Sequence, residues 1–188
     1  MKQRVERVFE KIVTPAKTGV LNISPLEIVA AGLTIGLLFW LNDAVATSKI
    51  PLIIPSFAAS VGVLYTQPGM SNARSWNVIA GQFFGALAGF ICASIFTGSL
   101  PLAVGCAVGL ALLFQRTTHS LHPPALATAL IVVITPDAHG AMFLVRPVLA
   151  GSIIIVAIAW IVHLFEITAL AHLKLMVTPP KEGEPSVT

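Results

Sequence analysis

Long apolar runs alternate with short polar breaks along almost the whole chain. Four runs have the length and composition of membrane-spanning helices, and they cover residues 26–46, 76–96, 100–115 and 144–166. The first run follows Ser24 and Pro25, a capping hydroxyl and a proline of the kind that begins helices. The pattern therefore predicts four long helices that cross a membrane.

Two further apolar runs are shorter and begin at prolines. Pro51 and Pro55 disfavour a helix between them, so this stretch is expected to be an extended leg of about 16 Å. A helix over 55–67 would add about 20 Å and complete a crossing of a ~30 Å hydrocarbon core. A polar stretch from Arg116 likewise precedes a short apolar run over 123–135. We expect two broken spans whose short helices begin near the middle of the bilayer.

The two broken spans resemble each other in sequence. Residues 55–60 (PSFAAS) and 123–128 (PPALAT) both open on proline and carry alanine and then a hydroxyl at matching positions. The halves 25–97 and 98–170 each read as a long span, a broken span and a long span. With three crossings in each half, the second would be inverted relative to the first. Chance similarity between segments rich in proline, alanine and serine is the alternative interpretation.

Composition supports an all-α integral membrane bundle. The chain has 188 residues, of which 56% are hydrophobic and 10% charged, against about 25% charged in a soluble domain; its mean hydropathy is +0.89. We predict a basic amphipathic segment over 1–24, a single transmembrane domain over 25–172 and a polar tail over 173–188. A bacterial inner membrane or an organelle inner membrane is the expected location.

Positive charge is unevenly distributed between the predicted ends of the spans. With six crossings and a cytoplasmic N-terminus, only Lys49 and Arg146 lie outside, and the remaining lysines and arginines lie inside. If the short segments re-enter instead of crossing, Arg74 and Arg116 move outside and the contrast weakens. The positive-inside rule therefore favours six crossings.

The short helices would aim their N-termini at a shared point. A helix N-terminus carries unpaired N–H groups and about half a positive charge, which together favour an anion. Around this point we expect side chains and backbone of the two short helices, namely Ser56, Ser60, Pro123, Pro124, Ala125 and Thr128. Asn77 and Gln82 would line the path or bond between helices. Such a site predicts weak, reversible binding of a small monovalent anion.

The polar stretch before the second short helix carries basic and imidazole groups. Arg116 could draw anions inward or serve as an anchor at the interface, and the sequence supports both interpretations equally. His122 could cap a backbone turn, which is the more frequent role, or carry protons. In an extended stretch His119 and His122 point to opposite sides, which disfavours a shared metal ion. No metal or cofactor is predicted.

Three segments resemble those of a known family of membrane proteins. Residues 121–130 (LHPPALATAL) resemble the segment after which the HPP family is named, and residues 55–60 resemble its Pro-Pro-Phe-Gly-Ala-Ser segment. Residues 77–82 (NVIAGQ) resemble its Asn-Val-Ile-Gly-Gly-His segment. The chain departs from the family at Ala58 and Leu126, which replace glycine, and at Gln82, which replaces histidine. The resemblance implies transport of nitrite, with which chloroplast and cyanobacterial members are associated.

Other function classes fit the residues less well. An enzyme would need converging nucleophile, base or metal ligands, and motifs such as HExxH or GxSxG do not occur in the sequence. A cation transporter usually has carboxylates within its spans, whereas the acidic residues here lie at span ends or outside. A membrane scaffold would need no polar core. The expected partners are a small inorganic anion and the lipid bilayer, with no nucleic acid.

A row of glycines four residues apart marks one face of the span over 76–96. Gly81, Gly85 and Gly89 permit close packing of another helix. The partner could be a helix of the same chain or a second copy, and we expect a homodimer.

Overall fold

The protein is seen in a computed structural model that describes residues 25–44, 54–135 and 140–177. Within these ranges every regular element is helical. The helices are α2 (Pro25–Ala44), α3 (Ser56–Thr66), η1 (Ser71–Ala73), α4 (Ser75–Ile95), α5 (Leu100–Thr117), α6 (Pro124–Ile134), α7 (Ala141–Phe143), the π-helical η3 (Leu144–Gly151) and α8 (Ser152–Val177). The prediction of an all-α membrane bundle is confirmed.

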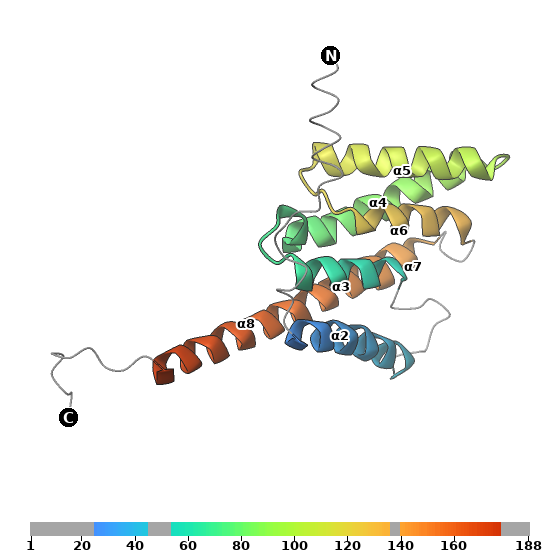
Figure 1. Ribbon diagram of the computed structural model, residues 1–188. Coiled ribbons are helices and arrows are strands. Elements are labelled where there is room, and N and C mark those ends of the chain that lie inside the picture. Colours follow the sequence, from blue (N-terminus) through green and yellow to red (C-terminus); the bar gives the residue numbers. More distant parts are fainter. Residues whose placement is uncertain (1–24, 45–53, 136–139, 178–188) are drawn as a thin grey trace, which may run out of the picture.

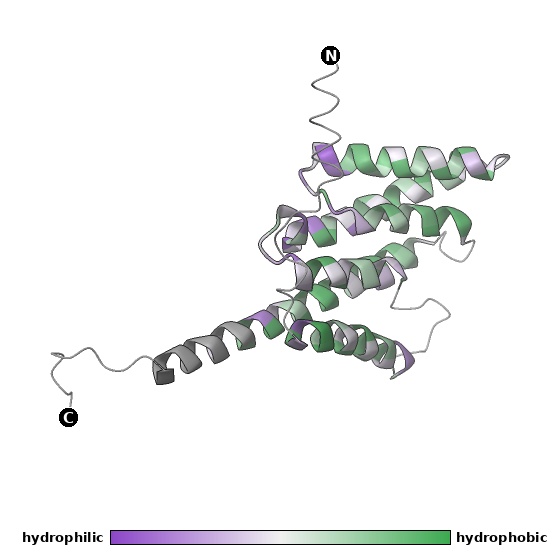
Figure 2. Ribbon diagram, in the orientation of Figure 1, coloured by the Kyte–Doolittle hydropathy of each residue, from purple (hydrophilic) through white to green (hydrophobic). Residues whose placement is uncertain are grey.

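In the part of the chain that the structure describes, four helical stretches are long and apolar enough to cross a membrane, as predicted. They cover Pro25–Ala44, Ser75–Ile95, Leu100–Thr117 and Ala141–Phe165. Figure 2 shows apolar residues along the lengths of these helices and hydrophilic residues gathered at helix ends. Large apolar side chains such as Trp40 and Phe165 are exposed on the outer surface, where lipid would replace water as solvent.

Successive helices run in alternating directions through the bundle (Figure 1). The end of α3 lies at the end of the bundle where α2 begins (Figure 1). The indole Nε1–H of Trp76 at the start of α4 donates to the carbonyl of Thr118 just after α5, at 3.4 Å. Arg74 and Arg116 therefore lie at the end of the molecule where α2 begins, which agrees with six crossings.

The glycine face of α4 packs against α6. A Cβ atom built on Gly81 would lie 2.7 Å from the Cβ of His122, and one on Gly89 would lie 2.7 Å from the carbonyl oxygen of Ala129. One on Gly85 would collide with the backbone of Ala125. This face therefore makes a contact within the chain, which is one of the two alternatives, and it offers no support for a homodimer.

Two apolar clusters hold the bundle together. The larger cluster includes Leu38 of α2, Phe57 of α3 and Ile155 of α8. The smaller cluster joins α4, α5 and α6, and α5 contributes alanines four residues apart, among them Ala103 and Ala107. A buried polar contact adds to the first cluster, because Thr34 of α2 and Tyr65 of α3 share a hydrogen bond of 2.9 Å.

The last long helix differs from the prediction at both ends. Helical backbone begins at Ala141 and continues to Val177, beyond the expected end at Glu166. Pro147 lies inside η3. Proline lacks an N–H and clashes with the preceding turn, which accounts for the wider π-helical winding of this segment.

Some predictions concern residues that the structure does not describe. These are the amphipathic segment over 1–24, the extended leg as far as residue 53 and the part of the tail from residue 178. The inverted repeat stays a prediction.

Candidate functional site

The first turns of the two short helices lie side by side and run in opposite directions. The Ser56 and Thr128 hydroxyl oxygens are 2.7 Å apart, and the Ser60 Oγ is 2.9 Å from Nε2 of His122. Because Gly85, at the middle of α4, faces Ala125, α6 begins about halfway along α4. The short helices therefore meet deep within the bundle.

Five buried polar side chains from α3, α4 and the start of α6 form one hydrogen-bonded network. They are Ser56, Ser60, Gln82, His122 and Thr128, and each is at most 2% exposed. The Thr128 hydroxyl donates to Oε1 of Gln82, and the Gln82 Nε2 donates to Ser60 Oγ at 2.9 Å. Gln82 thus connects the two short helices through both atoms of its amide. We call these five residues the polar cluster.

The imidazole of His122 is fixed by a hydrogen bond on each nitrogen. Its Nδ1 lies 2.8 Å from the carbonyl oxygen of Asn72. A carbonyl only accepts, so Nδ1 carries hydrogen and donates. In the neutral ring Nε2 then accepts the hydroxyl hydrogen of Ser60. The polar cluster is therefore continuous with the backbone of η1.

The N-terminus of α6 does not present the unpaired N–H groups that we expected. Pro123 and Pro124 have no N–H to offer. The N–H groups of Ala125 and Leu126 donate to the carbonyls of His122 and Pro123, both at 3.0 Å. The His122 N–H is also paired, since it donates to Oε1 of Gln115 at 2.9 Å.

The beginning of α3 likewise does not present the unpaired backbone N–H groups that we expected. Pro55 lacks an N–H, and the N–H groups of Phe57 and Ala58 donate to the carbonyls of Ile54 and Pro55 at 2.9 and 3.2 Å. The expectation of free backbone donors is therefore wrong for these residues, because proline removes some donors and tight turns use others. The donors of the polar cluster are side-chain hydroxyls and an amide.

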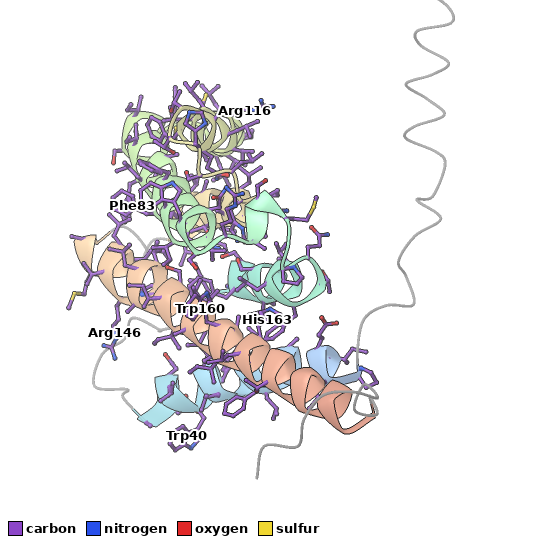
Figure 3. All side chains as sticks on the ribbon, turned by 90° about the vertical axis from the view of Figure 1, so that its left-hand side faces the viewer. Trp40, Phe83, Arg116, Arg146, Trp160 and His163 are labelled. Atoms are coloured by element: carbon purple, nitrogen blue, oxygen red, sulfur yellow. The ribbon has the colours of Figure 1, made fainter. Side chains whose placement is uncertain are left out.

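Five predicted site residues lie outside the polar cluster, namely Asn77, Arg116, Pro123, Pro124 and Ala125, of which Ala125 packs against Gly85. Asn77 is 7% exposed, and its Nδ2 donates to the carbonyl of Leu121 at 3.1 Å, so it supports the stretch before α6. Arg116 is exposed in the last turn of α5, and Figure 3 shows it at the opposite edge of the molecule from α8. Pro123 is exposed and Pro124 half-buried, and neither is in the network.

Sequence reasoning missed two buried residues beside the polar cluster. Gln115 is completely buried, and its Nε2 has no hydrogen-bond partner in the described structure. Ser120 is completely buried and shares a 2.7 Å hydrogen bond with the Thr118 hydroxyl. For Gln115 the sequence did offer a signal, because a glutamine ends an apolar run seven residues before His122.

The chemistry of the polar cluster is that of neutral hydrogen-bonding groups. It holds three hydroxyls, one amide and one imidazole, and no carboxylate. Among the residues that the structure describes, no three metal-ligating side chains lie close enough to hold an ion. The cluster could therefore offer hydrogen bonds to a small polar or anionic ligand without binding a cation by charge.

The sequence matches the family described as HPP, transmembrane region, over residues 18–169. Two transmembrane proteins of Dictyostelium discoideum are similar to it. The first is 33% identical over 123 residues, which are 63% of this chain and 43% of the relative. The second is 33% identical over 118 residues, which are 60% of this chain and 38% of the relative. The chain thus spans less than half the length of these relatives.

No solved structure matches the chain. The family match covers most of the chain and includes the residues of the polar cluster. Together with the four apolar membrane-length helices, it leads to one conclusion: the chain is an integral membrane protein that belongs to the HPP transmembrane family.

Proposed function

We propose that the protein transports a small monovalent anion, with nitrite as the first candidate and nitrate as the second. The observation that carries the proposal is the polar cluster, which lies completely buried between two short helices in an apolar bundle. Buried polar groups at such depth are costly and usually mark a substrate path. The association of HPP family members with nitrite supports the choice of substrate.

The available donors suit an anion better than a cation. The hydroxyls of Ser56, Ser60 and Thr128 and the amide Nε2 of Gln82 can each give a hydrogen to an oxyanion. A hydrogen bond to a charged group contributes about 1.5–3 kcal/mol. The N-terminal ends of α3 and α6 add about 0.3–2 kcal/mol each through their dipoles. These terms suit an ion that binds briefly and leaves.

Transport requires the polar cluster to open. In the present arrangement its donors bind one another, as in the contact of Gln82 Nε2 with Ser60 Oγ. A shift of α3 away from α4 and α6 would release these donors, and an entering anion would replace the lost contacts. Gln115, with its unpaired buried Nε2, would add a donor next to His122.

His122 can change its protonation state without losing its partners. The hydroxyl of Ser60 lies 2.9 Å from Nε2 of His122 and 3.1 Å from the carbonyl of Ser56. If Nε2 gains a proton, it donates to Ser60, and the Ser60 hydroxyl turns to the carbonyl. We therefore include coupling to protons as an arm of the test.

A membrane scaffold without transport is the second candidate. The completeness of the network favours it, because the hydroxyls and the Gln82 amide all have partners within the protein. Such networks also stabilise helix contacts in membranes, by about 0.6 kcal/mol on average for each bond. Flux measurements separate the two functions.

The test is ion flux into liposomes that contain the purified protein. We expect nitrite to enter faster than into protein-free liposomes, and sodium and sulfate to enter no faster. An inward proton gradient will raise the nitrite rate if His122 couples the two ions. If nitrite flux equals that of protein-free liposomes with and without the gradient, the transport proposal is wrong and the scaffold role remains.

The proposal also includes the setting of the protein. We place it in a bacterial inner membrane or an organelle inner membrane, with the N-terminus on the cytoplasmic side. A homodimer stays a prediction, but the glycine face of α4 no longer supports it.

A further inference from the structure

A hollow lies away from the polar cluster, among α3, the start of α4 and α8. Its volume is about 720 Å³. Leu64 contributes from α3, Arg74 and Ser75 from the start of α4, and Trp160 and His163 from α8. Figure 3 shows Trp160 and His163 along the same stretch of α8. None of these residues has a role in the proposed transport.

One part of this cavity is polar and positive. Arg74 and Ser75 both line it, and Ser75 is the first residue of α4. The helix dipole adds partial positive charge at this end. The described lining residues include no carboxylate, so the charge at this part of the cavity favours an anionic group.

The rest of the lining is apolar. Val156, Ala159, Trp160 and Leu164 extend the cavity along α8. Trp160 is 71% exposed, and tryptophan is enriched where membrane proteins meet lipid headgroups. His163 donates from Nε2 to the carbonyl of Leu64 at 3.1 Å, which holds α8 against α3 at the cavity wall.

This combination points to one kind of occupant. A small hydrated anion would use the cation but gain nothing from the long apolar wall. An uncharged acyl chain would use the wall but not the cation. A molecule with an anionic head and a hydrocarbon tail uses both, and the surrounding bilayer supplies such molecules. Arg74 lies at an end of the bundle, level with Arg116, where headgroups are found.

We propose that this cavity binds one phospholipid with an anionic headgroup. The phosphate lies on Arg74 and Ser75, and an acyl chain follows α8 past Trp160. This inference is independent of the proposed transport, because it uses none of the residues of the polar cluster.

The test uses Trp160 as a contact probe. Trp40 and Trp76 are replaced by phenylalanine, which leaves Trp160 as the only tryptophan. The protein is placed in phosphatidylcholine vesicles that contain a minor fraction of phosphatidylglycerol or phosphatidylcholine with brominated acyl chains. Bromine quenches indole fluorescence on contact. We expect the anionic lipid to associate about five-fold more strongly than the zwitterionic one.

Matched variants assign this preference to Arg74. Arg74→Gln should abolish the preference, whereas Arg74→Lys should keep most of it. Arg116→Gln removes a cation from the same end of the bundle but from outside the cavity, and it should keep the preference in full. Normal elution of each variant from a sizing column confirms that it is folded.

Several results would overturn the proposal. Equal quenching by the two lipids would mean ordinary contact with the bilayer. Equal loss of preference in Arg74→Gln and Arg116→Gln would mean attraction by overall surface charge. If neither brominated lipid quenches Trp160, protein rather than lipid covers the cavity.

Discussion

At the residue scale, Gln82 is the centre of the polar cluster. Its Oε1 accepts the Thr128 hydroxyl and its Nε2 donates to Ser60. The amide therefore joins groups from α3, α4 and α6 without carrying charge. Histidine, which the family has at this position, could not offer a carbonyl oxygen to Thr128 and would need another arrangement of hydrogens.

Replacement of Gln82 should destabilise the protein. In Gln82→Met the shape is similar, but the hydrogen bonds to Ser60 and Thr128 are lost. We expect a loss of about 1–3 kcal/mol, because buried polar groups remain without their partner. Thermal unfolding in detergent measures this loss. Gln67→Met removes an amide from an exposed position and is the control. Equal melting temperatures for the two variants would contradict a role for the network in stability.

The sequence allowed five residues of the polar cluster to be predicted. Hydroxyls at matching positions in the two short segments identified Ser60 and Thr128, and Ser56 follows Pro55 at the start of the first segment. Gln82 and His122 were the remaining polar residues of the segments that resemble the family. Gln115 was missed because its position beside His122 depends on the turn at His119, where φ is 53°. The spacing of residues along the chain does not reveal such a turn.

The free backbone donors were predicted wrongly for a local reason. Helix N-termini do leave N–H groups unpaired in general. Here the prolines that begin the helices also remove N–H groups, and the following residues close tight turns on residues 54–55 and 122–123. The prolines suggested an anion site, but they also remove backbone N–H groups from it. The remaining hydrogen-bond donors are therefore side chains.

At the element scale, α6 packs directly against one face of α4. Gly81, Gly85 and Gly89 leave no room for a Cβ atom on this face. By contrast, Gly105 and Gly109 on α5 have no atom within 4 Å of the position of a Cβ. The spacing of four residues is the same in both rows, so it indicates where a close contact is possible but not which row forms one.

A pair of alanine substitutions tests this difference. Gly85→Ala pushes α6 away from α4 and should cost about 1–3 kcal/mol by overpacking. Gly109→Ala meets open space and should be neutral or stabilise the helix by up to about 1 kcal/mol. Thermal unfolding of both variants in the same detergent measures the difference. A Gly85→Ala protein as stable as Gly109→Ala would show that α6 does not pack on this face.

Hydropathy predicted which segments form helices more reliably than it predicted where the last helix begins and ends. The short helices begin within one residue of the predicted prolines. The last helix continues past Glu166 to Val177, because hydropathy marks the apolar part of a helix and not the point where its backbone hydrogen bonds stop. The π-helical segment around Pro147 was not predicted, since a proline inside a span can kink, break or widen a helix.

At the whole-molecule scale, alternating helix directions place the basic helix ends together. Arg74 precedes α4 and Arg116 lies in the last turn of α5, and these helix ends are joined by the hydrogen bond from Trp76 to Thr118. Hydropathy alone could not decide between crossing and re-entrant short segments. The charge bias favours crossing, because it compares the two sides of the membrane.

Cysteine labelling tests the opposite directions of α4 and α5. With Cys92 and Cys106 replaced by alanine, Ser71→Cys and Thr117→Cys should react with a membrane-impermeant maleimide from one side only. Gly98→Cys, at the opposite helix ends, should react only from the other side. Labelling of all three cysteines from the same side of sealed vesicles would contradict the alternating arrangement.

The account depends on the polar cluster as the path of the anion, and nitrite uptake by a double variant tests this most directly. Ser60→Ala with Thr128→Ala removes one hydroxyl from each short helix. Ser94→Ala is the control, because that exposed hydroxyl donates only to the Phe90 carbonyl of its own helix.

Liposomes with the control should take up nitrite at the wild-type rate. Those with the double variant should be slower by roughly ten-fold or more, as expected for the loss of two hydrogen bonds to a charged ligand. Uptake by a folded double variant at the control rate would contradict the placement of the anion path between α3 and α6.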